Sequence, residues 1–269
     1  MKKEGTDMSK IGFIGMGNMA QAIAEGWVKK GMEKESLYAY APTWDKLVKN
    51  AERIGFVPVK SAEELAEVSD IVVIACKPYQ IDEVLGRISD KLRGKALISV
   101  AAGWVFDTFA EKLDNVRIQC IMPNTPAMVG EGVFLFENKC TLSEEENSFI
   151  RSLFAELGVV IDMPTALMGI GGAVSGCGPA FVDLFMEAYA DAAVKYGVPR
   201  ATAYKLIAQT VLGSAKLQME TGKHPGVLKD EVCSPSGTTI CGVAALEENG
   251  FRNACIKSID AIMLKKSGR

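Results

Sequence analysis

Small residues near the N-terminus are spaced so that backbone could come close to a ligand. The segment reads Gly12-Phe-Ile-Gly15-Met-Gly17-Asn-Met-Ala20 and joins a short apolar run to a helical pattern. Gly15 would permit a tight turn, Gly17 would let the backbone approach a pyrophosphate, and Ala20 would let the helix lie close to the strand. Free N–H groups at the start of the helix would complete an anion site. The segment therefore predicts a dinucleotide site, in preference to a structural turn alone.

The segment after the second apolar run bears on the choice of dinucleotide. Residues 40–43 read Tyr-Ala-Pro-Thr, and no acidic residue follows before Asp45. An NAD-selective site commonly has Asp or Glu about 20 residues after the glycines, and such a carboxylate would repel a 2′-phosphate. Its absence favours NADP(H), with Thr43 and Lys46 as neighbours. No arginine stands there, so NAD(H) remains the alternative.

A second segment suited to small-molecule chemistry lies near the C-terminus. Residues 234–239 read Ser-Pro-Ser-Gly-Thr-Thr and precede an apolar helical run, as a helix cap and first turn do. The exposed N–H groups of such a turn could hold a carboxylate, and the hydroxyl of Thr239 could donate a hydrogen bond. The alternative is an N-cap that binds no ligand.

Other reactive side chains are scarce. His224 is the one histidine, in a Lys-His-Pro-Gly segment where a loop residue is expected, and a Ser-His-Asp hydrolase would depend on it. The seven cysteines include no Cys-x-x-Cys pair. They are expected to be reduced cytosolic thiols, because their number and spacing fit neither a disulfide framework nor a zinc site. No metal is expected.

Charge and hydropathy limit the partners. The formal net charge of −3 gives no reason to expect nucleic acid or an anionic membrane. No apolar run approaches the roughly 20 residues that span a bilayer. The first ten residues carry two lysines but no apolar stretch before Gly12, which indicates a short lead-in instead of a secretory signal. The chain is expected to be cytoplasmic.

The elements that must position these segments are of two kinds. The hydrophobic pattern of the sequence changes from mixed strands and helices to helices alone at about Pro164. Before it, short β-rich runs alternate with helical stretches, as in a Rossmann-type, doubly wound α/β sheet. Strands are expected at 10–14, 37–40, 70–75, 96–100, 116–122 and, as a later edge strand, 133–136, and helices at 19–30, 44–54, 62–68, 81–92 and 105–113. A dinucleotide-binding domain is therefore predicted over residues 1–163.

The remainder, residues 164–269, predicts an all-helical domain. After Pro179, apolar residues recur at helical spacing: Phe181, Leu184, Phe185, Ala188, Tyr189 and Ala192. Such a stripe normally indicates core packing. A region of about a hundred residues buries several stripes poorly when alone, so a homodimer that shares this surface is expected.

Several further motifs occur in a fixed order along the chain. They are Ala75-Cys76-Lys77-Pro78, Ala101-Ala102-Gly103, Met122-Pro123-Asn124-Thr125-Pro126, Ser175-Gly176-Cys177-Gly178-Pro179-Ala180, His224-Pro225-Gly226 and Val232-Cys233-Ser234-Pro235-Ser236-Gly237-Thr238-Thr239-Ile240. With the opening glycine segment, this set resembles the pyrroline-5-carboxylate reductases from residue 10 onward. The resemblance implies hydride transfer from NAD(P)H to the C=N carbon of Δ1-pyrroline-5-carboxylate, which gives L-proline in the final step of proline biosynthesis. It also implies an interlocked dimer and larger assemblies of such dimers.

The resemblance also implies roles for particular residues. Thr239 would be catalytic, donating to the imine nitrogen, and Ser234, Gly237, Thr238 and Thr239 would receive the substrate. The cofactor would contact Ile14, Gly15, Met16, Gly17, Asn18, Met19, Ala41, Pro42, Thr43, Ala75, Cys76, Lys77, Pro78, Ala102 and Gly103. Lys77 is a weaker catalytic candidate, since it could simply lie near cofactor phosphate or ribose.

Two positions depart from the family pattern. The family usually has Gly-Gly after Ser-Pro, whereas Ser236 takes the first of those positions here. A serine would be strained there if the turn needs a positive φ. The family also often has Asn before the third helix of the nucleotide half, where this chain has Ser61.

The sequence bears on three rival functions. A β-hydroxyacid dehydrogenase would have a lysine after its Gly-x-Gly motif, whereas residues 179–183 read Pro-Ala-Phe-Val-Asp. A reductase for six-membered cyclic imines remains open, because one methylene contributes only about 1–3 kcal/mol of discrimination. A dinucleotide sensor would have no use for a second small-molecule site at residues 234–239.

Overall fold

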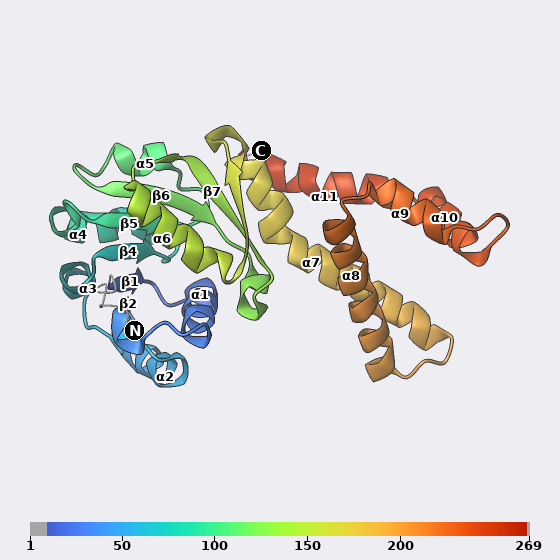
Figure 1. Cartoon of the computed structure of the whole chain (residues 1–269), viewed down its shortest axis with the longest axis horizontal. Helices are drawn as coiled ribbons and strands as arrows, with labels where there is room; N and C mark the ends of the chain where they lie inside the picture. The colour runs from blue at the N-terminus through green and yellow to red at the C-terminus, as the bar shows by residue number, and fades with distance from the viewer. Residues whose placement is uncertain (1–9, 268–269) are drawn as a thin grey trace, which may run out of the picture. The chain divides into compact units, whose positions relative to one another are not determined.

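The computed structural model describes residues 10–267 of the chain (Figure 1). The chain divides into two compact units, Met1–Cys177 and Gly178–Arg269, and the division falls inside one helix, α7 (Thr165–Lys195). The boundary predicted at residues 163 and 164 lies just before this helix and stays a prediction. Nine of the ten residues of the expected lead-in lie outside the described part of the chain.

The first unit contains an eight-stranded sheet in the order β3-β2-β1-β4-β5-β6-β7-β8. The first six strands are parallel and follow the Rossmann order 3-2-1-4-5-6. The strands are β1 (Ile11–Ile14), β2 (Leu37–Tyr40), β3 (Val57–Pro58), β4 (Ile71–Ile74), β5 (Ala96–Ser99), β6 (Arg117–Met122), β7 (Gly132–Cys140) and β8 (Gly158–Met163). The predicted fold class is confirmed.

Six α-helices cover the sheet on both faces (Figure 1). They are α1 (Asn18–Lys29), α2 (Trp44–Ile54), α3 (Ala62–Val68), α4 (Ile81–Leu92), α5 (Phe106–Ala110) and α6 (Glu144–Ala155), with short 3-10 turns η1 (Lys34–Ser36), η2 (Pro78–Gln80) and η3 (Thr125–Val129). Helices α1, α2 and α6 share one buried apolar cluster with alternate strand residues such as Phe13 and Val73. Helices α3, α4 and α5 share the other with Ile14 and Val72.

The far end of the sheet differs from the prediction. The run at 133–136 was expected to form an edge strand, but β7 lies between β6, to which it is antiparallel, and β8, to which it is parallel. The strand β8 was not predicted. Its apolar run, residues 159–161, is only three residues long and lies close to Pro164, and Val159 and Ile161 are exposed. The helix α6 was also missed, although Ser143 and Glu146 form a capping box that marks its start.

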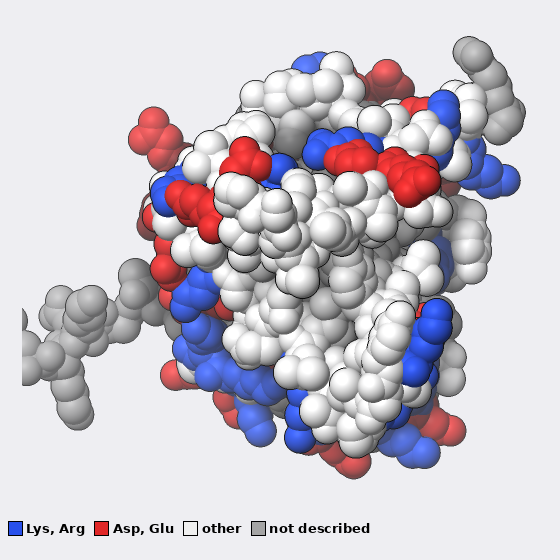
Figure 2. All heavy atoms as spheres, turned by 90° about the vertical axis from the view of Figure 1, so that its right-hand side faces the viewer, with Lys and Arg blue, Asp and Glu red and all other residues white. Residues whose placement is uncertain are grey.

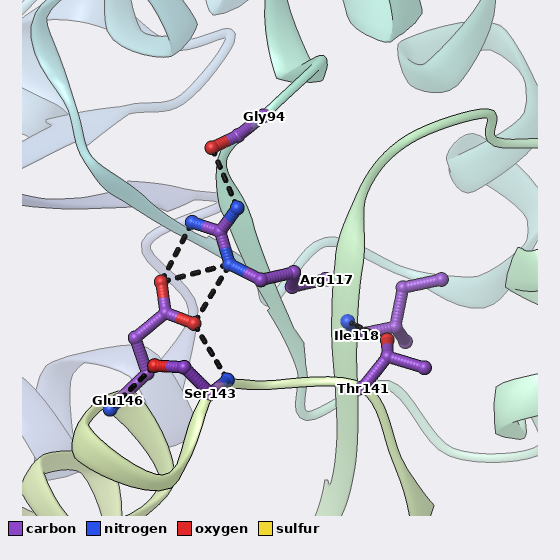
Figure 3. Close-up of polar contacts among 6 residues, drawn as sticks. All are labelled: Gly94, Arg117, Ile118, Thr141, Ser143 and Glu146. Atoms are coloured by element: carbon purple, nitrogen blue, oxygen red, sulfur yellow. Dashed lines mark hydrogen bonds and ion pairs between the residues drawn. The ribbon is translucent and has the colours of Figure 1, made fainter.

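Glu146 also joins the start of α6 to the sheet (Figure 3). Its carboxylate accepts hydrogen bonds from Nε and Nη2 of Arg117 on β6, each 2.7 Å from its nearer oxygen. Nη1 of Arg117 donates to the Gly94 carbonyl at 2.8 Å. The backbone N–H of Ser143 donates to the same carboxylate at 2.9 Å. These bonds, and chiefly those from Arg117, hold the pKa of Glu146 below its ordinary value of 4.5.

The second unit consists of helices alone within its described residues. After α7 come α8 (Arg200–Thr221), α9 (Pro225–Val232), α10 (Thr238–Glu248) and α11 (Phe251–Lys266). The predicted stripe after Pro179 is not buried within one chain, because Leu184 is 65% and Tyr189 41% exposed. Figure 2 shows a face of this part of the molecule on which uncharged side chains fill the middle and charged ones lie at the margins.

Helix α7 is the one described helix that is long and apolar enough to cross a membrane by length and composition. Its most apolar window has a mean hydropathy of 1.3, and 17% of that window is buried. Glycine, serine and proline interrupt the apolar side chains of this helix, and many of the apolar positions are alanine, which is why the sequence showed no continuous run of large apolar residues. Length and composition are weak evidence for a membrane span.

Candidate active site

Gly15 lies in the turn after β1, at the point where the ends of three strands come together. Its φ of +97° is one that side chains rarely adopt, and its N–H donates to the Tyr40 carbonyl at 2.8 Å. A Cβ atom on Gly15 would lie 2.6 Å from the backbone nitrogen of Cys76. The ends of β1, β2 and β4 therefore approach one another at this glycine, as the tight turn predicted from the sequence requires.

Gly17 is exposed and faces open space. It is the N-cap of α1, and a Cβ atom on it would meet no heavy atom within 4 Å. The N–H groups of the first turn have no acceptor within the helix. Ala20 is fully buried one turn further on, so the helix packs closely against the sheet. The residues present therefore fit a pyrophosphate, with space above Gly17 and donors from Asn18 onward.

The ends of β4 and β5 bring the other predicted cofactor residues to the same edge of the sheet. The Ala75 N–H donates to the Ile14 carbonyl at 2.8 Å, and Lys77 precedes η2. Ala102 and Gly103 follow β5, which is the neighbour of β4. The carboxyl ends of adjacent parallel strands form the usual ligand crevice of this fold. Burial raises the pKa of Cys76 to about 11, so its thiol is neutral at physiological pH.

The end of β2 has free hydroxyl and cationic groups. Thr43 is the N-cap of α2 but makes no side-chain capping bond. Lys60, which the sequence did not single out, has its ammonium 6.0 Å from the ring centre of Trp44. Ser61 is the N-cap of α3 and accepts from the Glu64 N–H at 3.0 Å, so its hydroxyl already has a structural role. Only the three-dimensional structure could show that Lys60 lies over the residue next to Thr43.

The predicted substrate segment forms a turn followed by α10. The Gly237 N–H donates to the Ser234 carbonyl at 3.0 Å. Pro235 and Ser236 occupy the middle of the turn, and Ser236 has a φ of +57°, as the third residue of a type II turn requires. A Cβ on Gly237 would lie 2.3 Å from Oγ of Ser234. Serine is thus in the left-handed region where the family pattern has glycine.

Helix α10 begins directly after this turn. Thr238 and Thr239 are exposed in its first turn, where N–H groups lack intrahelical acceptors. This segment belongs to the helical unit, whereas the predicted cofactor residues belong to the sheet unit. The site residues thus form two groups, each assembled within its own unit.

The side chains of His224 and Asn124 both have structural roles. His224 is the N-cap of α9, and its Nδ1 accepts from the Gly226 N–H at 3.0 Å. Among residues 10–267, no group of three or more His, Cys, Asp and Glu side chains is placed to hold a metal ion. Asn124, part of a motif to which the sequence assigned no role, is 6% exposed and bonded through both ends of its amide.

The sheet with its dinucleotide turn and the separate helical unit define a two-unit oxidoreductase of the Rossmann type. Residues 10–103 match the family model described as NADP oxidoreductase, coenzyme F420-dependent, and residues 165–268 match that described as pyrroline-5-carboxylate reductase dimerisation. The chain is 43% identical over 261 residues to the pyrroline-5-carboxylate reductase of Escherichia coli (strain K12), covering 95% of this chain and 96% of the relative. It is 39% identical to that of Treponema pallidum (strain Nichols), covering 94% and 98%.

Solved structures agree with these relatives. The pyrroline carboxylate reductase of Plasmodium falciparum, with NADP bound, has a TM-score of 0.88 at 33% identity and covers 97% of this chain and 98% of its own. That of Coxiella burnetii has a TM-score of 0.87 at 32% identity with the same coverage. The chain belongs to the pyrroline-5-carboxylate reductase family, and the resemblance read from the motifs is confirmed. A reductive aminase from Aspergillus terreus, at 17% identity and a TM-score of 0.55, shares the fold alone.

Proposed function

We propose that this protein reduces Δ1-pyrroline-5-carboxylate to L-proline with NADPH, the final step of proline biosynthesis. The observation that carries the proposal is the turn at residues 234–239 that opens α10, in a chain that matches a named reductase over 95% of its length. The reaction saturates the C=N bond: a hydride is added to carbon and a proton to nitrogen. The cofactor, when bound, supplies the hydride.

The chain would hold the cofactor at the carboxyl edge of the sheet. The N–H groups after Gly17 would bind the pyrophosphate, residues 75–78 would line the cofactor under β4, and Ala102 and Gly103 would lie near its nicotinamide half. The neutral thiol of Cys76 adds no negative charge beside the phosphates, because its pKa is raised to about 11 by burial. At β2, Thr43, Lys46 and Lys60 provide a polar and cationic surface that suits a 2′-phosphate.

The helical unit would hold the imino acid. The first-turn N–H groups of α10 would bind its carboxylate, with Ser234 and Gly237 shaping the turn. The hydroxyl of Thr239 would donate to the ring nitrogen and orient the C=N carbon. A cyclic imine is basic enough to enter partly protonated, so positioning provides most of the rate. This accounts for a reductase whose one histidine is a helix cap.

Assembly and location complete the proposal. The match to a dimerisation model over residues 165–268 supports a homodimer and supports the domain boundary at residues 163 and 164. Larger assemblies of such dimers are implied by the family resemblance alone. All seven cysteines are free thiols, which supports a cytoplasmic location.

The test compares Thr239→Ala with Thr239→Ser, which keeps the hydroxyl. With NADPH and pyrroline-5-carboxylate, we expect T239A to lower kcat by about 100-fold or more, since one positioned proton donor is lost, while T239S stays within a few-fold of wild type. Kd for NADPH, measured by nicotinamide fluorescence, should not change. Unchanged turnover in T239A would remove Thr239 from the mechanism, and a wild-type protein that forms no proline would overturn the function. A strong preference for NADH in the same assay would overturn the cofactor choice.

A further inference from the structure

Pro179 leaves one backbone acceptor of α7 without its helical donor. In an α-helix the carbonyl of residue i accepts from the N–H of residue i+4. Pro179 lies inside α7 and has no N–H, so the carbonyl of Ser175 loses that partner. A buried backbone carbonyl without a hydrogen bond costs free energy comparable to a lost hydrogen bond. Ser175 is half-buried, so a hydrogen-bond donor from another group would stabilise its carbonyl.

Asn124 satisfies this carbonyl. Its Nδ2 donates to the Ser175 carbonyl at 3.0 Å, while its Oδ1 accepts from the Val133 N–H at 2.8 Å. Because a carbonyl only accepts and an N–H only donates, the two partners fix the orientation of the amide. The side chain therefore ties α7 to the start of β7 through a residue in the segment after β6.

The part of α7 before Pro179 also packs tightly on the sheet. A Cβ on Gly171 would lie 2.8 Å from Cδ1 of Leu135, and a Cβ on Gly172 would lie 3.2 Å from Cγ of Met122. The helix is thus fixed to the sheet unit up to Ser175. The next residues, 176–179, read Gly-Cys-Gly-Pro, and the chain divides into its two units between Cys177 and Gly178.

We propose that Asn124 is a positioning residue for the reaction, an inference that rests on the proposed function. Asn124 bonds to the Ser175 carbonyl, which has no donor within the helix, and so holds α7 rigid up to Ser175. Bending of the helix is then confined to residues 176–179. Two glycines and a proline within one turn are the usual cause of a bend. Everything beyond this joint, including the turn at residues 234–239, is carried by the helical unit. Without this hydrogen bond, the flexible part of α7 would extend to residues before 176. The turn at residues 234–239 would then adopt the orientation needed for the reaction in a smaller fraction of molecules.

The proposal couples Asn124 to Pro179, so the experiment is a double-mutant cycle. Asn124→Asp has nearly the same shape and keeps an acceptor for the Val133 N–H, but it removes the donor to Ser175. Pro179→Ala restores an N–H at residue 179 that can bond to the same carbonyl. The four proteins, wild type, N124D, P179A and the double variant, are compared in kcat, in Kd for NADPH and in amide hydrogen exchange over residues 171–183.

We expect N124D to lower kcat about tenfold, the order of magnitude that one lost hydrogen bond to a partly buried carbonyl gives, with Kd for NADPH within twofold of wild type. Amide exchange at residues 171–175 should be faster in N124D than in the wild type. In the P179A background the same substitution should change kcat less than threefold and leave exchange at these residues unchanged. Recovery of folded N124D only in the P179A background supports the same coupling.

Equal losses in both backgrounds, or failure to fold in both, would overturn the role of Asn124. So would an N124D protein whose exchange at residues 171–175 matches wild type. Exchange and NADPH binding do not depend on turnover. An error in the proposed function would instead appear as wild-type protein that forms no proline while the exchange coupling persists.

Discussion

Gly15 and Gly17, two residues apart, have opposite constraints in the folded chain. Gly15 has a positive φ, and any side chain would meet the backbone of Cys76, whereas Gly17 has an ordinary φ of −76° and open space above it. The fold therefore requires glycine at position 15, but it does not require glycine at position 17. The space above Gly17 is what a pyrophosphate would fill.

Alanine at each glycine separates the two requirements. We expect Gly15→Ala to lower the free energy of unfolding by about 1–2 kcal/mol or more, because a left-handed conformation costs that much with a Cβ and the clash with Cys76 adds to it. Gly17→Ala replaces a favourable N-cap residue, which costs about 0.5–1 kcal/mol, but it also lowers the entropy of the unfolded chain, which offsets about 0.4–1 kcal/mol. The net change in the free energy of unfolding should therefore be less than about 0.5 kcal/mol, while NADPH binding should weaken at least tenfold. Urea unfolding and fluorescence titration measure the two quantities. Equal stability losses, or full NADPH affinity in G17A, would contradict this division.

At the scale of single residues, local spacing predicted the dinucleotide turn because Gly15, Gly17 and Ala20 follow a strand and open a helix at the spacing of a recognised motif. The concern about Ser236 was also correct, since its φ is positive. The role of Asn124 could not be predicted, because its amide bonds to a carbonyl 51 residues away. The position of Lys60 over Trp44 depends equally on how β2 and β3 pair.

At the scale of elements, the strongly patterned parts of the sheet were predicted with nearly correct ends. β2 and α2 agree in both bounds, because the strand is a β-rich run and Gly55 ends the helix with a φ of +91°. The order of strands beyond β6 was not predictable from pattern. β7 pairs with β8 only because α6 returns the chain beside it, and α6 has only two buried apolar residues, Ile150 and Phe154.

The start of α6 provides a test of one element. Glu146→Gln keeps an acceptor for the Ser143 N–H but removes the charge that pairs with Arg117. We expect it to lower the free energy of unfolding at pH 7 by about 1–2 kcal/mol, an estimate reduced because Arg117 is 37% exposed. Glu145→Gln, one residue earlier on the same exposed turn, is the control and should change little.

The pH dependence has a definite sign. The pKa of Glu146 is lowered in the folded chain, so its carboxylate stabilises the fold above the ordinary value of 4.5 and loses this effect as pH falls through the folded pKa. The difference between wild type and E146Q, measured by urea unfolding, should therefore be constant near neutral pH and shrink below about 4.5. A difference that stays constant down to pH 2 would show that charge pairing with Arg117 is not its source.

At the scale of the whole molecule, the helical unit does not bury its own apolar side chains. Within α8, Leu206 is 56% and Leu212 54% exposed, and Ile256 on α11 is 62% exposed. Phe185, Tyr189 and Leu206 line an open groove of about 550 Å³ between α7 and α8. The sequence predicted this outcome, since a helical region of about a hundred residues with several apolar stripes has too little interior to cover such side chains.

Association should therefore depend on this groove. We expect light scattering to give the mass of a dimer or a multiple of it, and Leu206→Asp to weaken dimerisation at least tenfold, because a carboxylate would replace a side chain whose burial contributes about 1.5–3 kcal/mol. Lys205→Asp, the neighbouring substitution with a larger change of charge, should retain the wild-type mass at the same protein concentration. A wild-type protein that stays monomeric at high micromolar concentration would contradict the homodimer, because its helical unit would then be stable with these side chains in water.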